Sequence, residues 1–150
     1  MKIRLYFFGI AGIVLILDQV TKYLVGVGLP PYRSVPVIKG ILYLTYIRNT
    51  GAAFGLFGGF RIPLIIFGII ISAIVIYFHF RISTKNYFIQ GPLALILGGS
   101  LGNLADRIFR SYVVDFIDFR FWPAFNIADI AVNLGIVLLI ARLIMRKESL

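Results

Sequence analysis

Cysteine is absent from this sequence, and only six of its 150 residues are acidic. Without cysteine there is no disulfide, no thiol nucleophile and no cysteine metal site. The chain also cannot be lipidated on a cysteine of its own. Histidine occurs once, as His79, which leaves little material for histidine-based catalysis or metal binding.

The scarcity of acidic residues gives the chain a net charge of +9, with fifteen Lys and Arg. A soluble protein with this charge would be a candidate for nucleic-acid binding, but here the basic residues are scattered between apolar blocks and form no stripe. A basic surface that meets anionic lipid headgroups is the better interpretation. We therefore expect membrane lipids as partners, and no nucleic acid.

Hydrophobic residues make up 60% of the chain and charged residues 14%, and the mean hydropathy is +0.96. Soluble domains are about half apolar and about a quarter charged. So apolar a chain has too little polar surface to cover a water-soluble globule, and its apolar residues must face acyl chains. The sequence predicts one integral membrane domain over residues 1–150.

Four segments are apolar enough to cross a hydrocarbon core, which needs ~20 helical residues. They are residues 5–27, 62–80, 87–104 and 127–145. The start of the chain is charged like a signal peptide, but its apolar run continues to Val27 without a small-residue cleavage site and is better read as a retained span. Gly98, Gly99 and Gly102 in the third segment suit close helix packing in lipid.

Two inserts, at residues 28–61 and 105–126, separate the first span from the second and the third from the fourth. Residues 41–49 are rich in β-branched and aromatic types and end in an Asn-Thr-Gly turn, which predicts a strand. Residues 111–121 are also strand-like and stop at Trp122-Pro123. The expected fold is a membrane all-α bundle of four transmembrane helices with a small extracytoplasmic β-sheet.

The orientation of the chain in the membrane can be predicted only from the basic residues beside the short tails and loop. Seven basic residues lie on the side of the termini and eight on the other side, so the counts alone do not decide. The first group flanks short tails and a tight loop, where the positive-inside rule holds best. We expect both termini in the cytoplasm. That first group is Lys2, Arg4, Arg81, Lys85, Arg142, Arg146 and Lys147.

Five of the six acidic residues fall on the non-cytoplasmic half of this topology. They are Asp18, Asp106, Asp115, Asp118 and Asp129. Carboxylates at a membrane boundary are costly, so each is a functional candidate, with ion pairing for assembly as the alternative. Asp18 and Lys22 are spaced i, i+4 and predict a snorkelling pair. Asp106 precedes Arg107, a possible charge partner, which favours a structural role.

Asp129 lies in the first turn of the fourth predicted span, and Asn126 three residues earlier is a good N-cap. Asp115 and Asp118 lie in a predicted strand, where alternation puts them on opposite faces. Only one of these two can face the bundle, and the pattern does not decide which one it is.

Other chemistries lack their parts. His79 is expected at the cytoplasmic end of the second span, remote from the aspartates, so neither a Ser-His-Asp triad nor a histidine zinc site can form there. A Ser-Lys dyad of Ser100 and Lys22 is disfavoured because Ser100 would lie deeper in the membrane. Two carboxylates sharing one proton can activate water without metal or cofactor, and we expect neither.

Five motifs in order along nearly the whole chain resemble those of lipoprotein signal peptidases, also called signal peptidase II. They are Leu-Asp-Gln at 17–19 with Lys22, Arg-Asn-Thr-Gly-Ala-Ala-Phe at 48–54, Gly-Gly-Ser-Leu-Gly-Asn-Leu-Ala-Asp-Arg at 98–107, Val-Val-Asp-Phe at 113–116 and Trp-Pro-Ala-Phe-Asn-Ile-Ala-Asp at 122–129. The resemblance implies a periplasmic β-cradle in a protein of the bacterial inner membrane, acting as a monomer. It also implies an aspartic endopeptidase that cleaves prolipoproteins before a diacylglyceryl-modified cysteine.

The same resemblance implies roles for single residues. The catalytic pair would be Asp115 and Asp129, which leaves Asp118 outside it. The substrate-binding positions would be Asn49, Gly51, Asn103, Arg107 and Asn126. Asp18, Lys22 and Asp106 would be structural polar residues.

Two alternatives remain open at this point. A presenilin-type protease would carry a Gly-x-Gly-Asp motif on a helix, and the sequence contains no such motif. A small ion-coupled transporter would want polar groups through the full depth of the membrane, and here the cytoplasmic halves of the spans are almost wholly apolar.

Overall fold

The computed structural model describes residues 2–51, 61–82 and 86–147. Its elements, in chain order, are α1 (Lys2–Gly28), β1 (Ser34–Ile38), β2 (Leu42–Asn49), α2 (Arg61–Arg81), α3 (Tyr87–Phe109), β3 (Val113–Asp118) and α4 (Ile127–Lys147). All four helices are long and apolar enough to cross a membrane. The predicted fold class, four membrane helices with a small sheet, is confirmed. Residues 52–54 of the second motif lie outside the described residues.

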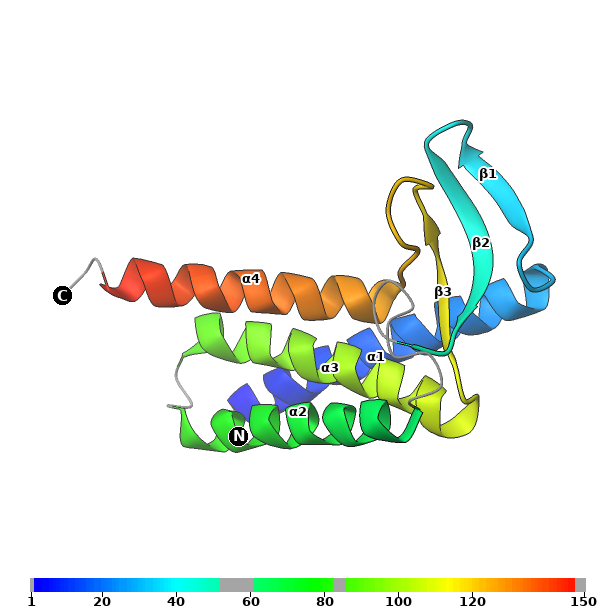
Figure 1. Ribbon diagram of the computed structural model, residues 1–150. Coiled ribbons are helices and arrows are strands. Elements are labelled where there is room, and N and C mark those ends of the chain that lie inside the picture. The colour runs from blue at the N-terminus through cyan, green and yellow to red at the C-terminus, as the bar shows by residue number, and fades with distance from the viewer. Residues whose placement is uncertain (1, 52–60, 83–85, 148–150) are drawn as a thin grey trace.

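Helix α3 is the centre of the bundle. Helices α1, α2 and α4 all pack against it, and α2 and α4 lie on opposite sides of it (Figure 1). Small residues make this possible, since a Cβ on Gly98 would lie 2.6 Å from the backbone oxygen of Ala11 in α1. Helix α3 also continues beyond residue 104, where the apolar segment ends, to Phe109. Asp106 and Arg107 are therefore helical residues and not part of the insert.

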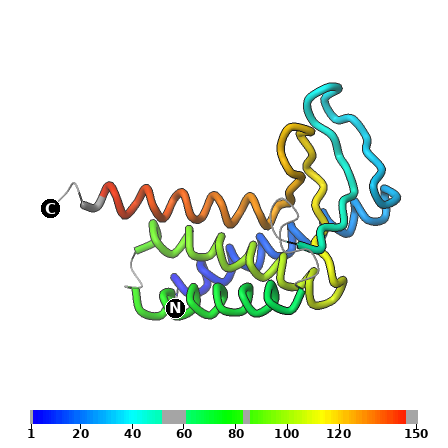
Figure 2. Tube along the Cα trace, viewed as in Figure 1, coloured from blue at the N-terminus to red at the C-terminus, as the bar shows by residue number. Residues whose placement is uncertain are grey.

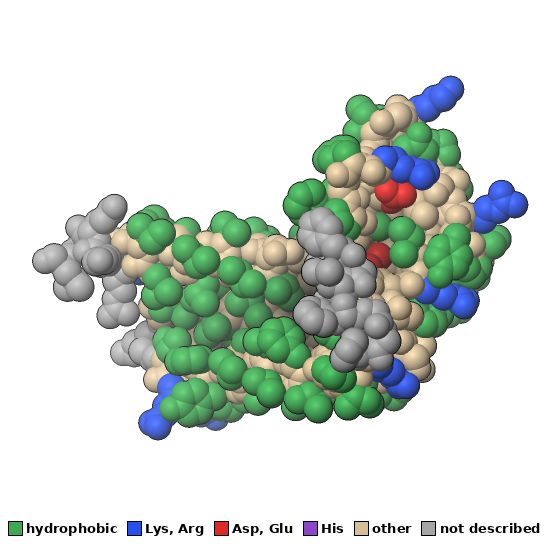
Figure 3. Space-filling view, viewed as in Figure 1, with side chains coloured by type: hydrophobic (Ala, Val, Ile, Leu, Met, Phe, Trp, Pro, Cys, Tyr) green, Lys and Arg blue, Asp and Glu red, His purple; other side chains and the backbone are tan. Residues whose placement is uncertain are grey.

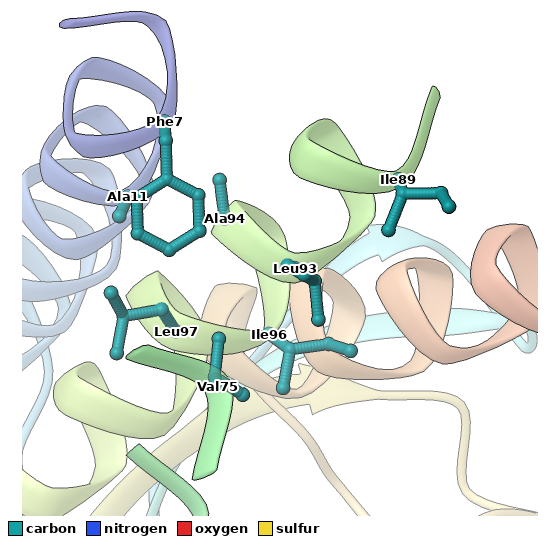
Figure 4. Packing of buried hydrophobic residues seen from close by; sticks show 8 residues of the cluster. All are labelled: Phe7, Ala11, Val75, Ile89, Leu93, Ala94, Ile96 and Leu97. Atoms are coloured by element: carbon teal, nitrogen blue, oxygen red, sulfur yellow. The ribbon is translucent and has the colours of Figure 1, made fainter. Parts of the chain in front are cut away.

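The apolar core lies in the half of the bundle where α1 begins and α4 ends. Phe7 and Ala11 of α1 meet Leu93 and Leu97 of α3 there, with Val75 of α2 (Figure 4). The cluster contains none of the aspartates, which all lie toward the sheet.

His79, near the end of α2, is buried in this same half of the bundle. Its Nδ1 lies 2.6 Å from Oε1 of Gln90 on α3, and its ring stacks on Phe7 with the centroids 3.8 Å apart. His79 thus connects three helices through one hydrogen bond and one ring contact, and it lies far from the aspartates along the bundle.

The sheet is antiparallel, in the order β1-β2-β3, and stands at the end of the bundle where α1 and α3 finish and α4 begins (Figures 1 and 2). Val25 of α1 packs with Tyr46, Val114 and Phe116 and fixes the sheet on the bundle. The strands expected within residues 41–49 and 111–121 are confirmed as β2 and β3. Strand β1, which contains Pro36, is an edge strand, where a missing backbone donor is tolerated.

The surface agrees with a protein set in lipid. On the face drawn in Figure 3, hydrophobic side chains cover the helices, and Lys and Arg gather at the two ends of the molecule. Several of these basic side chains project from the sheet, at the level where a lipid surface would meet water.

Candidate active site

A polar cavity of about 260 Å³ lies where the sheet meets the bundle. Four of the elements contribute to its wall. Its polar lining residues are Asn49 of β2, Asn103 and Arg107 of α3, Asp115 of β3, and Asp129 and Asn133 of α4. Segments distant in sequence thus bring two of the five aspartates to one cavity.

Asp115 is 3% exposed and lies in β3 opposite Ile47 of β2. Its two oxygens each accept a hydrogen bond from an amide, Oδ1 from Nδ2 of Asn126 at 2.7 Å and Oδ2 from Nδ2 of Asn49 at 2.9 Å. The carboxyl group is therefore fixed in orientation by two side chains from different elements.

Asp129 is fixed by the start of α4. Its backbone N–H donates to Oδ1 of Asn126 at 2.9 Å, and the backbone N–H of Asn126 donates to Oδ2 of Asp129 at 3.3 Å. This reciprocal pair is a capping box and confirms Asn126 as the N-cap. The other oxygen of Asp129, Oδ1, accepts from Nδ2 of Asn103 at 2.8 Å.

Asn126 connects the two carboxylates. Its Oδ1 caps α4 beside Asp129, while its Nδ2 donates to Asp115 and, at 3.2 Å, to Oδ1 of Asn103. The side chain is fully buried, and both of its polar atoms bind protein groups. We interpret Asn126 as a positioning residue for the pair, and its expected contact with substrate stays a prediction.

Burial changes the acidity of Asp115. Loss of hydration disfavours the charged carboxylate and raises the pKa of Asp115 to about 7, and the nearby negative charge of Asp129 acts in the same direction. The amide hydrogen bonds from Asn49 and Asn126 favour the ionised form and lower the pKa in part. Near neutral pH this carboxyl group is thus able to hold a proton.

Lys22 is only 1% exposed, so the predicted snorkelling of its side chain is wrong. Its Nζ lies 2.8 Å from Oδ2 of Asp18, 3.0 Å from Oδ2 of Asp106 and 3.0 Å from Oδ1 of Asn103. Three oxygens from two helices hold the ammonium inside the protein, where it has no need to reach the membrane surface. Through Asn103 this buried network adjoins Asp129.

The expected partner of Asp106 was also wrong. Asp106 forms ion pairs with Lys22 and with Arg110, which follows it by one helical turn and shares its face, whereas Arg107 points elsewhere. The guanidinium of Arg107 donates to the backbone oxygen of Gly51 at 3.1 Å and lines the polar cavity. Arg107 and Gly51 are thus placed at the site together.

Asp118 is directed away from the cavity, in agreement with the alternation along β3. Its Oδ2 accepts a hydrogen bond from Oγ1 of Thr45 at 2.7 Å and lies 3.5 Å from Nε of Arg120. These contacts connect β3 to β2 within the sheet. Of the two aspartates in this strand, Asp115 is the one that faces the site.

A second cavity, about 570 Å³, adjoins the polar one and runs along the bundle between α2 and α4. Asn103, Arg107 and Asp129 line both cavities. Further along, its wall is apolar and includes Phe67 and Ile136. Ser100 also lines this cavity. It is not one of the three oxygen partners that hold the ammonium of Lys22, so the two residues do not form a Ser-Lys dyad.

Two carboxyl groups, Asp115 buried and Asp129 half-buried, are oriented by amides at one end of a helical membrane bundle, an arrangement suited to an aspartic peptidase. Among the described residues no cluster of three His, Asp or Glu side chains could hold a metal ion. A family model described as "Signal peptidase (SPase) II" matches residues 10–145. The chain belongs to the signal peptidase II family, and it is a membrane-spanning protease.

Similar proteins support this assignment over nearly the full length. The chain is 41% identical to a lipoprotein signal peptidase from Halothermothrix orenii, over 85% of this chain and 88% of that protein. It is 44% identical to one from Caldanaerobacter subterraneus subsp. tengcongensis, over 87% and 90%. A solved structure of a bacterial membrane enzyme is 36% identical and superimposes with a TM-score of 0.91, covering 96% of this chain and 90% of that chain.

Proposed function

We propose that this chain removes signal peptides from prolipoproteins, and that Asp115 and Asp129 carry out the hydrolysis. The bond cleaved is the one before a diacylglyceryl-modified cysteine. The observation that carries this proposal is the meeting of the two carboxyl groups in one polar cavity that continues into an apolar groove between α2 and α4.

The two aspartates have different tasks in this proposal. Asp115, whose pKa is raised to about 7, is protonated and donates a hydrogen bond to the scissile carbonyl oxygen. Asp129 is ionised and takes a proton from water as the water oxygen attacks the carbonyl carbon. That proton then passes to the leaving amine while the carbonyl re-forms and the proton shared with Asp115 returns to it. Both carboxyl groups end as they began.

The apolar groove suits a substrate that arrives through lipid. Helices α2 and α4 each pack on α3, and the groove runs between them toward the middle of the bundle. An apolar signal-peptide helix or an acyl chain can lie there while the peptide bond reaches the aspartates. Asn49, Gly51 and Arg107 are the proposed contacts for the extended peptide at the mouth.

We place the protein in the bacterial inner membrane, with the sheet and the site facing the periplasm and both termini in the cytoplasm. The basic residues beside the short tails and the α2–α3 loop support this orientation. The two solved relatives described as bacterial membrane enzymes fit the setting.

The function is tested by incubating the purified protein in detergent with a diacylated prolipoprotein and following its change in gel mobility. We expect cleavage of the diacylated form, with the same prolipoprotein lacking the diacylglyceryl group as the matched control and remaining uncut. Addition of a chelator should not alter the rate. Equal cleavage of the two forms would contradict the assigned substrate, because the groove would then have no part in recognition.

The pH dependence gives a second test. Because the pKa of Asp115 is raised to about 7, this carboxyl is protonated below that pH, and kcat/KM should fall as pH rises through it. The hydrogen bond from Asn49 favours the ionised form, so Asn49→Leu, which removes the donor and keeps a side chain of similar size, should move this alkaline limb to higher pH. An unchanged limb in this variant would assign the titration to another group.

A further inference from the structure

A third cavity, about 340 Å³, lies at the opposite end of the bundle from the active site, between α1, α3 and α4. Its lining is largely apolar, and the proposed peptidase chemistry makes no use of it. The residues that matter for its chemistry are Tyr6, Phe88, Pro92, Leu138, Arg142 and Met145. We refer to it as the terminal-end cavity.

Arg142 is the charged residue in this lining, and no carboxylate of residues 2–51, 61–82 or 86–147 pairs with it. Its Nε is buried and has no hydrogen-bond partner among the described residues. The guanidinium lies over the ring of Phe88, with 5.3 Å between its carbon and the ring centroid. The five aspartates lie at the other end of the bundle, so none of them neutralises this cation. A partly buried guanidinium without an anion is costly, and an anionic ligand would remove that cost.

The depth of Arg142 fits the headgroup region of a bilayer. It lies in the last turns of α4, which ends at Lys147, and at ~1.5 Å per residue its Cα is less than ~10 Å from the end of the helix. Tyr6 and Tyr87 pack edge to face at the same level, 5.1 Å between centroids, and such rings favour the membrane interface. The cavity therefore crosses from the polar boundary into the apolar layer.

We propose that the terminal-end cavity binds one anionic phospholipid from the leaflet at this end of the bundle. The phosphate would pair with the guanidinium of Arg142, and an acyl chain would lie along Pro92 and Leu138. Charge selects this occupant, because a zwitterionic lipid brings its own cation to the phosphate and gains less from Arg142. The proposal does not depend on the peptidase assignment.

The test uses the purified full chain in mixed micelles containing phosphatidylglycerol and phosphatidylcholine in equal amounts. Native mass spectrometry counts the lipid of each kind that stays bound. We expect phosphatidylglycerol to be retained in excess, by a ratio on the order of fivefold, and Arg142→Gln to bring the ratio close to one. Arg81→Gln is the matched control, because Arg81 is exposed near the same end and donates to Tyr77 outside the cavity.

Thermal unfolding provides an independent measurement on the wild-type chain. Phosphatidylglycerol should raise Tm more than phosphatidylcholine does, and inorganic phosphate added to phosphatidylcholine micelles should not reproduce the increase. Equal retention of the two lipids by the wild type, or an unchanged ratio in Arg142→Gln, would overturn the proposal. A full effect of inorganic phosphate alone would show an ion site in place of a lipid site.

Discussion

Asp115→Asn and Asp129→Asn should each lower the rate of prolipoprotein cleavage by roughly 10³-fold or more. Asn cannot supply the proton that Asp115 gives to the carbonyl oxygen, nor accept the proton that Asp129 takes from water. Both substitutions keep the size of the side chain and one of the two acceptor oxygens, so folding should be retained. The double variant should be scarcely slower than either single variant, because the two groups act together.

Asp118→Asn is the matched control for these variants. It lies in the same strand as Asp115, is 7% exposed, and binds Thr45 within the sheet, away from the cavity. It should keep most of the wild-type rate. Turnover of a diacylated peptide by the variants, with substrate binding measured in parallel, decides the matter. Substantial cleavage by either single variant of the pair would rule out the proposed mechanism.

The helices could be predicted from hydropathy because in lipid the apolar runs themselves define the spans. The prediction ended the third span at residue 104, since Asp106 and Arg107 interrupt the apolar run. Helix α3 nevertheless continues to Phe109. Its polar last turns are covered by Lys22, Arg110 and the backbone of β3, which a hydropathy pattern along one segment does not contain.

The site could be predicted less completely. Alternation along β3 showed that Asp115 and Asp118 face opposite ways, but choosing between them required the position of the sheet on the bundle or the resemblance to a family. The i, i+4 spacing of Asp106 and Arg110 is present in the sequence and predicts one of the two ion-pair partners of Asp106, whereas Lys22 lies on another helix. The bridge through Asn126 was not available, because it joins β3 to α4 only after both are packed.

Lys22→Met should lower the stability of the protein more than any surface substitution. It leaves the carboxylates of Asp18 and Asp106, both buried, without the ammonium that lies 2.8 Å and 3.0 Å from them. Breaking a buried pair by removing one partner costs about 3–5 kcal/mol. Thermal and denaturant unfolding in detergent should show this loss. Lys39→Met, which removes the same charge from an exposed turn, should have little effect.

Lys22→Met should also slow cleavage, because Lys22 helps to position Asp129 through Asn103 in addition to stabilising the fold. The ammonium donates to Oδ1 of Asn103, whose Nδ2 holds Asp129, so its loss leaves that oxygen with the 3.2 Å hydrogen bond from Asn126 and weakens the hold on the Asn103 amide. Adding Asp18→Asn to Lys22→Met removes the carboxylate left without its ion-pair partner, because Asp106 still pairs with Arg110. This second change should recover part of the stability, while Asn103 still lacks the ammonium donor. We therefore expect the double variant to unfold at a higher temperature than Lys22→Met and to remain slow in cleavage. A double variant no more stable than Lys22→Met would show that unpaired charge is not the source of the loss.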